Sequence, residues 1–81
     1  MKPVEHTHPD GIVTTEHLSN AWTVKENGLP IWGIYETEEA AILAVDFNDH
    51  ELKVLTGRIH AEQGRAITVQ DLNDYLKEIQ K

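Results

Sequence analysis

Residues 21–35 read AWTVKENGLPIWGIY and carry the strongest structural signal in the chain. Apolar residues alternate with polar ones around Asn27-Gly28, a pair whose tolerance of positive φ suits the two-residue type I′ turn of a hairpin. The resulting register pairs Glu26 with Leu29, Val24 with Ile31 and Trp22 with Gly33. Residues 21–35 are therefore predicted to form an antiparallel hairpin, in which Gly33 leaves room for the Trp22 indole.

The second strand of this hairpin has the character of a sheet edge. Pro30 has no N–H to donate, which is typical of edge strands. Trp32 and Ile34 lie beside this edge, on the side of the hairpin opposite Trp22, and exposed Trp residues often anchor protein interfaces. Burial of Trp32 within the monomer or in the seam of a homodimer is the other interpretation, and it is the commoner role of an aromatic residue.

The segment before the hairpin gives weaker signals. Residues 1–11 close with the turn signal Pro9-Asp10-Gly11 and offer little to a core, so we expect a mobile N-terminal tail. Residues 12–18 begin with β-branched side chains that favour a strand, whereas Thr15 also suits the N-cap of a short helix. We predict a third strand near residues 12–18, with the helix as the alternative.

Two helices are predicted after the hairpin. Thr37 is an N-cap candidate for a helix over about residues 37–63, in which Gly57 is the expected point of any break. Thr68 and Asp71 resemble a capping box at the start of a second helix over residues 69–80. The predicted fold class is therefore α+β: a single domain over residues 12–81, with a short antiparallel sheet packed against two helices.

Composition excludes several classes of protein. The chain has 81 residues, a formal net charge of −7 and no cysteine. This charge disfavours phosphate backbones and anionic membranes as partners, and the lack of cysteine excludes disulfides and thiolate zinc sites. The longest apolar run is Ala40 to Val45, and the chain begins without a signal-peptide pattern, so we expect a soluble cytoplasmic protein.

The search for catalytic and metal-binding motifs is mostly negative. Ser19 is the only serine and lacks the setting of a nucleophile, and no phosphate-binding glycine loop is present. His6 and His8 with Asp10 form one weak metal-ligand pattern. A second weak pattern is the helical spacing of Asp46, Asp49, His50 and His60, which we interpret as a solvated helix face. We therefore expect no catalytic residue, no metal and no cofactor.

The charge pattern is the stronger functional signal. From Glu26 to Leu52 the chain carries seven carboxylates and no Lys or Arg. A one-sided negative surface on the first long helix could steer a basic partner, although an acidic helix face is usually just a hydrated face. Together with the hairpin edge, the candidate partner-binding residues are Trp32, Ile34, Glu38, Glu39, Asp46, Asp49 and Glu51.

Part of the chain resembles a known DNA-binding arrangement. The pattern Trp22-x-Val24, Gly28, Ile31-x-Gly33-x-Tyr35-x-Thr37-x-Glu39 with an alanine-rich continuation is similar to the hairpin and helix of AP2-type and phage integrase arm DNA-binding domains. The resemblance covers residues 21 to about 48. It implies DNA contact through the sheet face by Arg and Trp side chains, where this hairpin offers Lys25 and Trp32.

Three functional hypotheses follow. The leading one is a non-catalytic binding or regulatory module that engages a protein partner, basic in character, through the acidic helix face and the Trp32 side of the hairpin. A homodimer is an additional expectation. The alternative is a nucleic-acid-binding hairpin and helix, and the third is a small metal-dependent protein.

Overall fold

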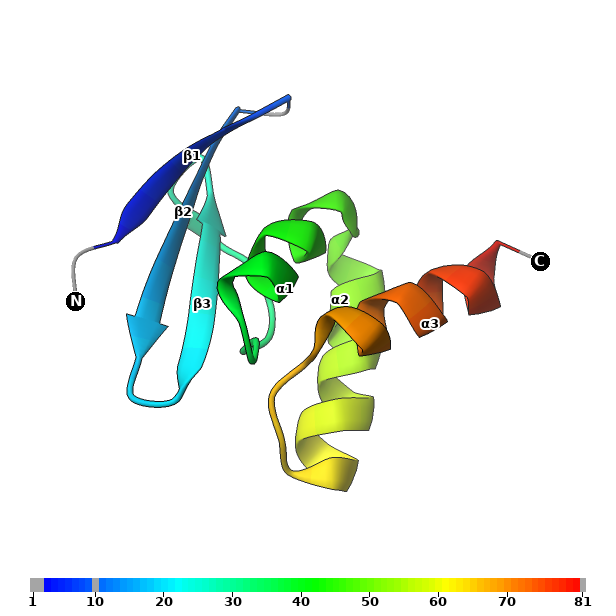
Figure 1. Ribbon diagram of the computed structural model, residues 1–81. Coiled ribbons are helices and arrows are strands. Elements are labelled where there is room, and N and C mark those ends of the chain that lie inside the picture. Colours follow the sequence, from blue (N-terminus) through cyan, green and yellow to red (C-terminus); the bar gives the residue numbers. More distant parts are fainter. Residues whose placement is uncertain (1–2, 10, 81) are drawn as a thin grey trace.

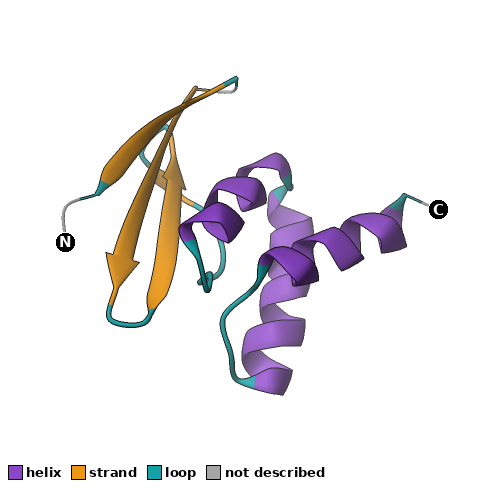
Figure 2. Ribbon diagram, in the orientation of Figure 1, coloured by secondary structure: helices purple, strands orange, loops and turns teal. Residues whose placement is uncertain are grey.

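Four antiparallel strands form a sheet in which the spatial order follows the sequence order (Figures 1 and 2). The structure, a computed structural model, describes residues 3–9 and 11–80. The strands are β1 (Val4–His8), β2 (Gly11–Leu18), β3 (Ala21–Glu26) and β4 (Leu29–Pro30). The α+β class is confirmed, and β2 resolves the ambiguity of residues 12–18 in favour of a strand.

Strand β1 corrects the prediction for the N-terminal segment. We expected residues 1–11 to form a tail, but Val4–His8 pair along their whole length with β2. Alternation explains the pairing: His6 lies opposite the fully buried Val13 and faces the helices, while its neighbours face solvent. Residues 1, 2 and 10 lie outside the described part of the chain.

The hairpin has the predicted turn but departs from the predicted register at its far end. Asn27 and Gly28 have φ of 51° and 84°, as a type I′ turn requires, and the Glu26–Leu29 pair is present. The predicted register holds as far as the Val24–Ile31 pair. Beyond Ile31 it shifts by two residues, so that Trp22 pairs with Tyr35 and not with Gly33. Two residues, Trp32 and Gly33, therefore bulge out of the edge.

The bulge is held by the side chain of Tyr35. This tyrosine is fully buried and its hydroxyl donates to the backbone carbonyl of Trp32. Gly33 has φ of 102°, and a Cβ there would lie 3.0 Å from the Tyr35 hydroxyl and 3.2 Å from Oγ1 of Thr56. Gly33 thus makes room for Tyr35 and the helical layer, which corrects the prediction that it makes room for Trp22.

The first predicted helix is divided, and the division falls earlier than expected. Phe47 is extended (φ −100°, ψ 150°), and Asn48 caps the next helix through reciprocal bonds with Glu51. Gly57, the expected break, is helical and begins a π-helical turn. The helical elements are α1 (Glu38–Leu43), η1 (Ala44–Asp46), α2 (Asp49–Thr56), η2 (Gly57–Ala61) and α3 (Val69–Ile79).

The cap predictions for the other helix starts are confirmed. The Thr37 hydroxyl accepts from the amide of Ala40, 3.1 Å away, at the start of α1. At the start of α3, Thr68 and Asp71 form the two reciprocal bonds of a capping box. These caps satisfy amide donors that the first turn of a helix leaves unpaired.

Small side chains bring α1 close to the sheet. Ala40, Ala41 and Ala44 are fully buried, and α1 contacts β2, β3 and α3. Figure 1 shows α1 between the sheet and the pair formed by α2 and α3. Among the described residues, no helix combines the length and apolar character needed to cross a bilayer.

Gly33 and Gly57 should respond to alanine substitution in opposite directions. Gly33→Ala adds a Cβ in crowded space at positive φ, so we expect the free energy of unfolding to fall by about 1–3 kcal/mol. Gly57→Ala adds a Cβ in open space at helical φ and ψ, and we expect a gain of about 0.5–1 kcal/mol. Urea unfolding measures both changes. A neutral Gly33→Ala variant would contradict the close packing of the bulge.

Candidate functional site

The carboxylate of Glu38 is used to dock α1 on the sheet. Thr15, fully buried in β2, donates from its hydroxyl to Oε2 of Glu38 over 2.8 Å. The same oxygen lies 3.3 Å from Nε2 of His6 in β1. A buried hydroxyl needs such a partner, because leaving it unpaired costs about 1–3 kcal/mol. Glu38 therefore has a structural role that limits its contact with a partner protein.

Glu39 and Asp46 border a groove between β1, α1, η1 and the start of α3. We call it the β1–α1 groove. It measures about 540 Å³, and its lining residues are His8, Glu39, Ile42, Leu43, Asp46 and Val69. The aliphatic side chains are half-buried, and Nε2 of His8 lies 3.2 Å from Oδ1 of Asp46. Two of the predicted partner-binding residues thus meet at an apolar surface.

Asp49 and Glu51 lie apart from this groove, in the first turn of α2. The Glu51 carboxylate accepts from the amide of Asn48 over 2.9 Å, so it is engaged in the helix cap. The break at Phe47 and Asn48 separates both residues from α1. The predicted acidic helix face is therefore not one surface.

The same break separates the predicted cluster of Asp46, Asp49, His50 and His60. Asp46 ends η1, whereas His50 is in α2. His60 contacts the hairpin instead: the Ile34 amide donates to Nε2 over 3.0 Å, and Nδ1 lies 2.7 Å from the Arg65 carbonyl. Within residues 3–9 and 11–80, no three His, Asp or Glu side chains are placed to hold a metal ion. The pattern of His6, His8 and Asp10 includes Asp10, which lies outside the described residues.

A second depression, of about 450 Å³, adjoins His60 and Arg65. Both His60 nitrogens contact backbone groups, which matches a neutral ring with its proton on Nδ1. Arg65 forms two bonds to the Asp71 carboxylate, of 2.7 and 2.9 Å. The polar side chains here already stabilise the fold, so the β1–α1 groove is the better candidate site.

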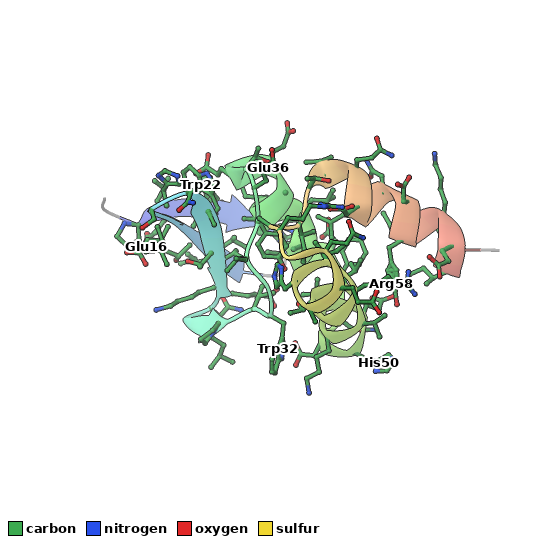
Figure 3. The ribbon with its side chains drawn as sticks, turned by 90° about the horizontal axis from the view of Figure 1, so that it is seen from below. Glu16, Trp22, Trp32, Glu36, His50 and Arg58 are labelled. Atoms are coloured by element: carbon green, nitrogen blue, oxygen red, sulfur yellow. The ribbon has the colours of Figure 1, made fainter. Side chains whose placement is uncertain are left out.

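Trp32 and Ile34 are exposed, which corrects the interpretation that Trp32 is buried within the monomer. Their exposed fractions are 50% and 43%, and Leu29, which the sequence did not single out, is 71% exposed. Lys53 Nζ lies 5.0 Å from the centre of a Trp32 ring, a cation–π arrangement. Figure 3 shows Trp32 on the side of the molecule opposite Glu36, with α1 on the Glu36 side. Trp32 and the groove are therefore separate surfaces.

The outer face of the sheet bears on the DNA-binding alternative. The strand register places Glu5, Glu16 and Lys25 on this face, together with threonines and aliphatic residues. Its described strand residues thus carry two anionic side chains and one cationic side chain. Contact with a phosphate backbone is built on clustered cations, so this face disfavours DNA as a ligand.

The sequence analysis missed the apolar floor of the groove and His8. Ile42 and Leu43 are adjacent apolar residues, and only the end of α1 at Leu43 leaves them beside α3. His8 was assigned to a mobile tail. The alternation of Val4, His6 and His8 with polar residues is the one signal that pointed to an ordered strand.

Tryptophan fluorescence should distinguish the two indoles. In a Trp22→Phe variant we expect Trp32 emission to lie at long wavelength and to be quenched readily by acrylamide, because the ring is half-exposed. The matched Trp32→Phe variant reports Trp22, which packs on His17 with ring centres 4.9 Å apart and should be quenched less. Blue-shifted, protected Trp32 emission would instead indicate burial in a dimer.

The ion pair between Arg65 and Asp71 at the start of α3 should make the free energy of unfolding depend on pH in the acid range. Hydrogen bonds from Arg65, and then those from Thr68, lower the pKa of Asp71 to about 2 from its usual 3.8. The stabilisation is therefore complete above about pH 4 and is lost as pH falls through about 2. Urea unfolding at several pH values measures this loss of stability in acid. The loss should be smaller in Asp71→Asn and unchanged in Asp74→Asn, which lies on the same helix. Equal profiles for both variants would contradict this assignment.

Comparisons of the chain with models of protein families, with curated proteins and with solved structures found no match. The likeness to AP2-type and integrase arm domains thus stays a resemblance of residues 21–48. The geometry described above is the basis for any statement about function.

Proposed function

We propose that this protein is a non-catalytic binding module whose β1–α1 groove takes a basic segment of a partner protein. The observation that carries the proposal is an apolar floor bordered by two carboxylates. Each part supplies a different component of recognition: burial of an apolar side chain supplies affinity, and charge supplies selection among partners.

The floor suits one large apolar side chain. Ile42, Leu43 and Val69 line the groove and are half-buried, so part of each side chain is accessible to a ligand. Full burial of a Leu or Phe side chain contributes about 1.5–3 kcal/mol from the hydrophobic effect, and partial burial in the groove contributes the corresponding part of it. An anchor of this kind is typical of short segments that dock in grooves.

Charge selects a basic segment. Glu39 and Asp46 both border the groove, and no Lys or Arg occurs between Lys25 and Lys53. The net charge of −7 adds long-range attraction for a cationic segment and repulsion for an acidic one. These terms favour a Lys- or Arg-containing segment that presents an apolar residue.

The Trp32 surface is not part of this proposal. It lies on the side of the molecule away from α1 (Figure 3), so a short segment in the groove does not reach it. The expectation of a homodimer stays a prediction, and the exposed Leu29, Trp32 and Ile34 are its natural location.

Selection from a random peptide display library tests the proposal. We expect the selected peptides to combine Lys or Arg with a Leu, Phe or Trp. Amide chemical shift changes on titration should cluster at Ile42, Leu43 and Val69. By calorimetry, Glu39→Gln should weaken the selected peptide about two- to fivefold, because one exposed charge is lost.

Glu62→Gln is the matched control, since Glu62 is exposed in the helical turn after η2 and outside the groove lining. It removes the same charge and should leave affinity within about twofold. Selected peptides without a basic bias would overturn the proposal. Shift changes centred on Trp32 would overturn it as well.

A further inference from the structure

His8 contacts the carboxylate that the proposed partner needs. Its Nε2 lies 3.2 Å from Oδ1 of Asp46, which connects the end of β1 to the end of η1. The His8 side chain is 14% exposed and that of Asp46 is 59% exposed. The imidazole is therefore covered, whereas the carboxylate is open to an approaching ligand.

We propose that in the free protein His8 occupies the position beside Asp46 that a cation of the partner occupies in the complex. A Lys or Arg of the bound segment then displaces His8 from this carboxylate. This inference rests on the proposed function of the β1–α1 groove. It makes His8 a residue that determines specificity, because His8 competes with the ligand for Asp46. Its consequence is that affinity for a basic segment falls in acid.

The competition depends on the charge of the imidazole. A neutral imidazole donates to the Asp46 carboxylate without carrying a charge of its own, whereas a Lys or Arg forms an ion pair with this carboxylate and adds coulombic attraction. A protonated imidazole forms such an ion pair itself and places a positive charge beside the groove. Histidine is the side chain whose charge changes most readily between pH 5 and 8.

The groups around His8 define this competition. Among the described residues lining the groove, Asp46 from η1 and Glu39 from α1 are the charged ones, and α3 contributes the uncharged Val69. Both carboxylates attract the same cation, so protonation of His8 opposes the ligand at both.

His6, on the same face of β1, does not take the same role. Its partner Glu38 also accepts the hydroxyl bond of the buried Thr15, over 2.8 Å. Releasing Glu38 to a ligand would break this short bond and leave the Thr15 hydroxyl with its longer contacts, to the Val4 carbonyl at 3.4 Å and to His6 at 3.2 Å, so binding at Glu38 carries a cost that binding at Asp46 does not. Asp46 has no corresponding bond to a buried hydroxyl among those described. The inference therefore concerns the pair of His8 and Asp46.

Calorimetry with one selected basic peptide at about pH 8 and about pH 5 tests the inference. We expect the affinity of the wild-type protein to fall about fivefold or more in acid. The affinity of the His8→Gln variant should fall about twofold or less, because only the remaining change in net charge acts on it. The matched control His50→Gln removes an exposed histidine in α2 outside the groove lining. Its affinity should fall in acid as much as that of the wild type.

A spectroscopic measurement on the wild-type protein guards against a folding defect in His8→Gln. At about pH 8 the imidazole nitrogen resonances of His8 should move on peptide addition, because the contact with Asp46 is lost. Those of His50 should not move.

The outcomes separate the inference from the function on which it rests. Peptide binding that is equally pH-dependent in wild type and His8→Gln would overturn the role of His8 and leave the groove as the binding site. So would His8 resonances that stay in place at saturation. No peptide binding at either pH would overturn the proposed function and this inference together.

Discussion

The contacts of Tyr35 join the two halves of this protein. Its backbone pairs with Trp22 on one side, and the adjoining Ile34 and Glu36 bond to Ile67 on the other, with N–O distances of 2.6–2.9 Å. Its side chain is buried, and burial raises the pKa of the phenol, so the hydroxyl keeps the proton that it donates to Trp32. One residue thus connects β3, the bulge and the chain entering α3.

The same connection sets the spacing of the helical layer. The bulge at Trp32 and Gly33 lets Tyr35 reach Trp22, and the missing Cβ of Gly33 admits the hydroxyl and the side chain of Ile67. Buried alanines then seat α1 on the sheet, and the bond between Thr15 and Glu38 orients it. With α1 in this position, η1 ends beside His8 and the β1–α1 groove forms.

This arrangement divides the surface by chemistry. The groove side presents Glu39 and Asp46 over aliphatic side chains, whereas the Trp32 side presents an indole beside Lys53. A chain with a net charge of −7 attracts basic segments over long distances, and the β1–α1 groove combines that attraction with an apolar anchor site. Recognition therefore depends on where the carboxylates lie as well as on how many there are.

The sequence by itself determined part of the local structure: the Asn27-Gly28 turn and the caps at Thr37 and Thr68. These features depend on φ preferences and on side chains that bond within three residues, so they are readable from neighbours in the chain. Other features were decided by the tertiary structure. β1 is ordered because β2 supplies its hydrogen bonds. The first helical stretch ends before Phe47 because burial of the Phe47 ring and capping at Asn48 outweigh helical periodicity. The hairpin register shifts because the Tyr35 side chain is buried in the core. The groove joins residues up to 61 positions apart, His8 and Val69, and only packing brings such residues together.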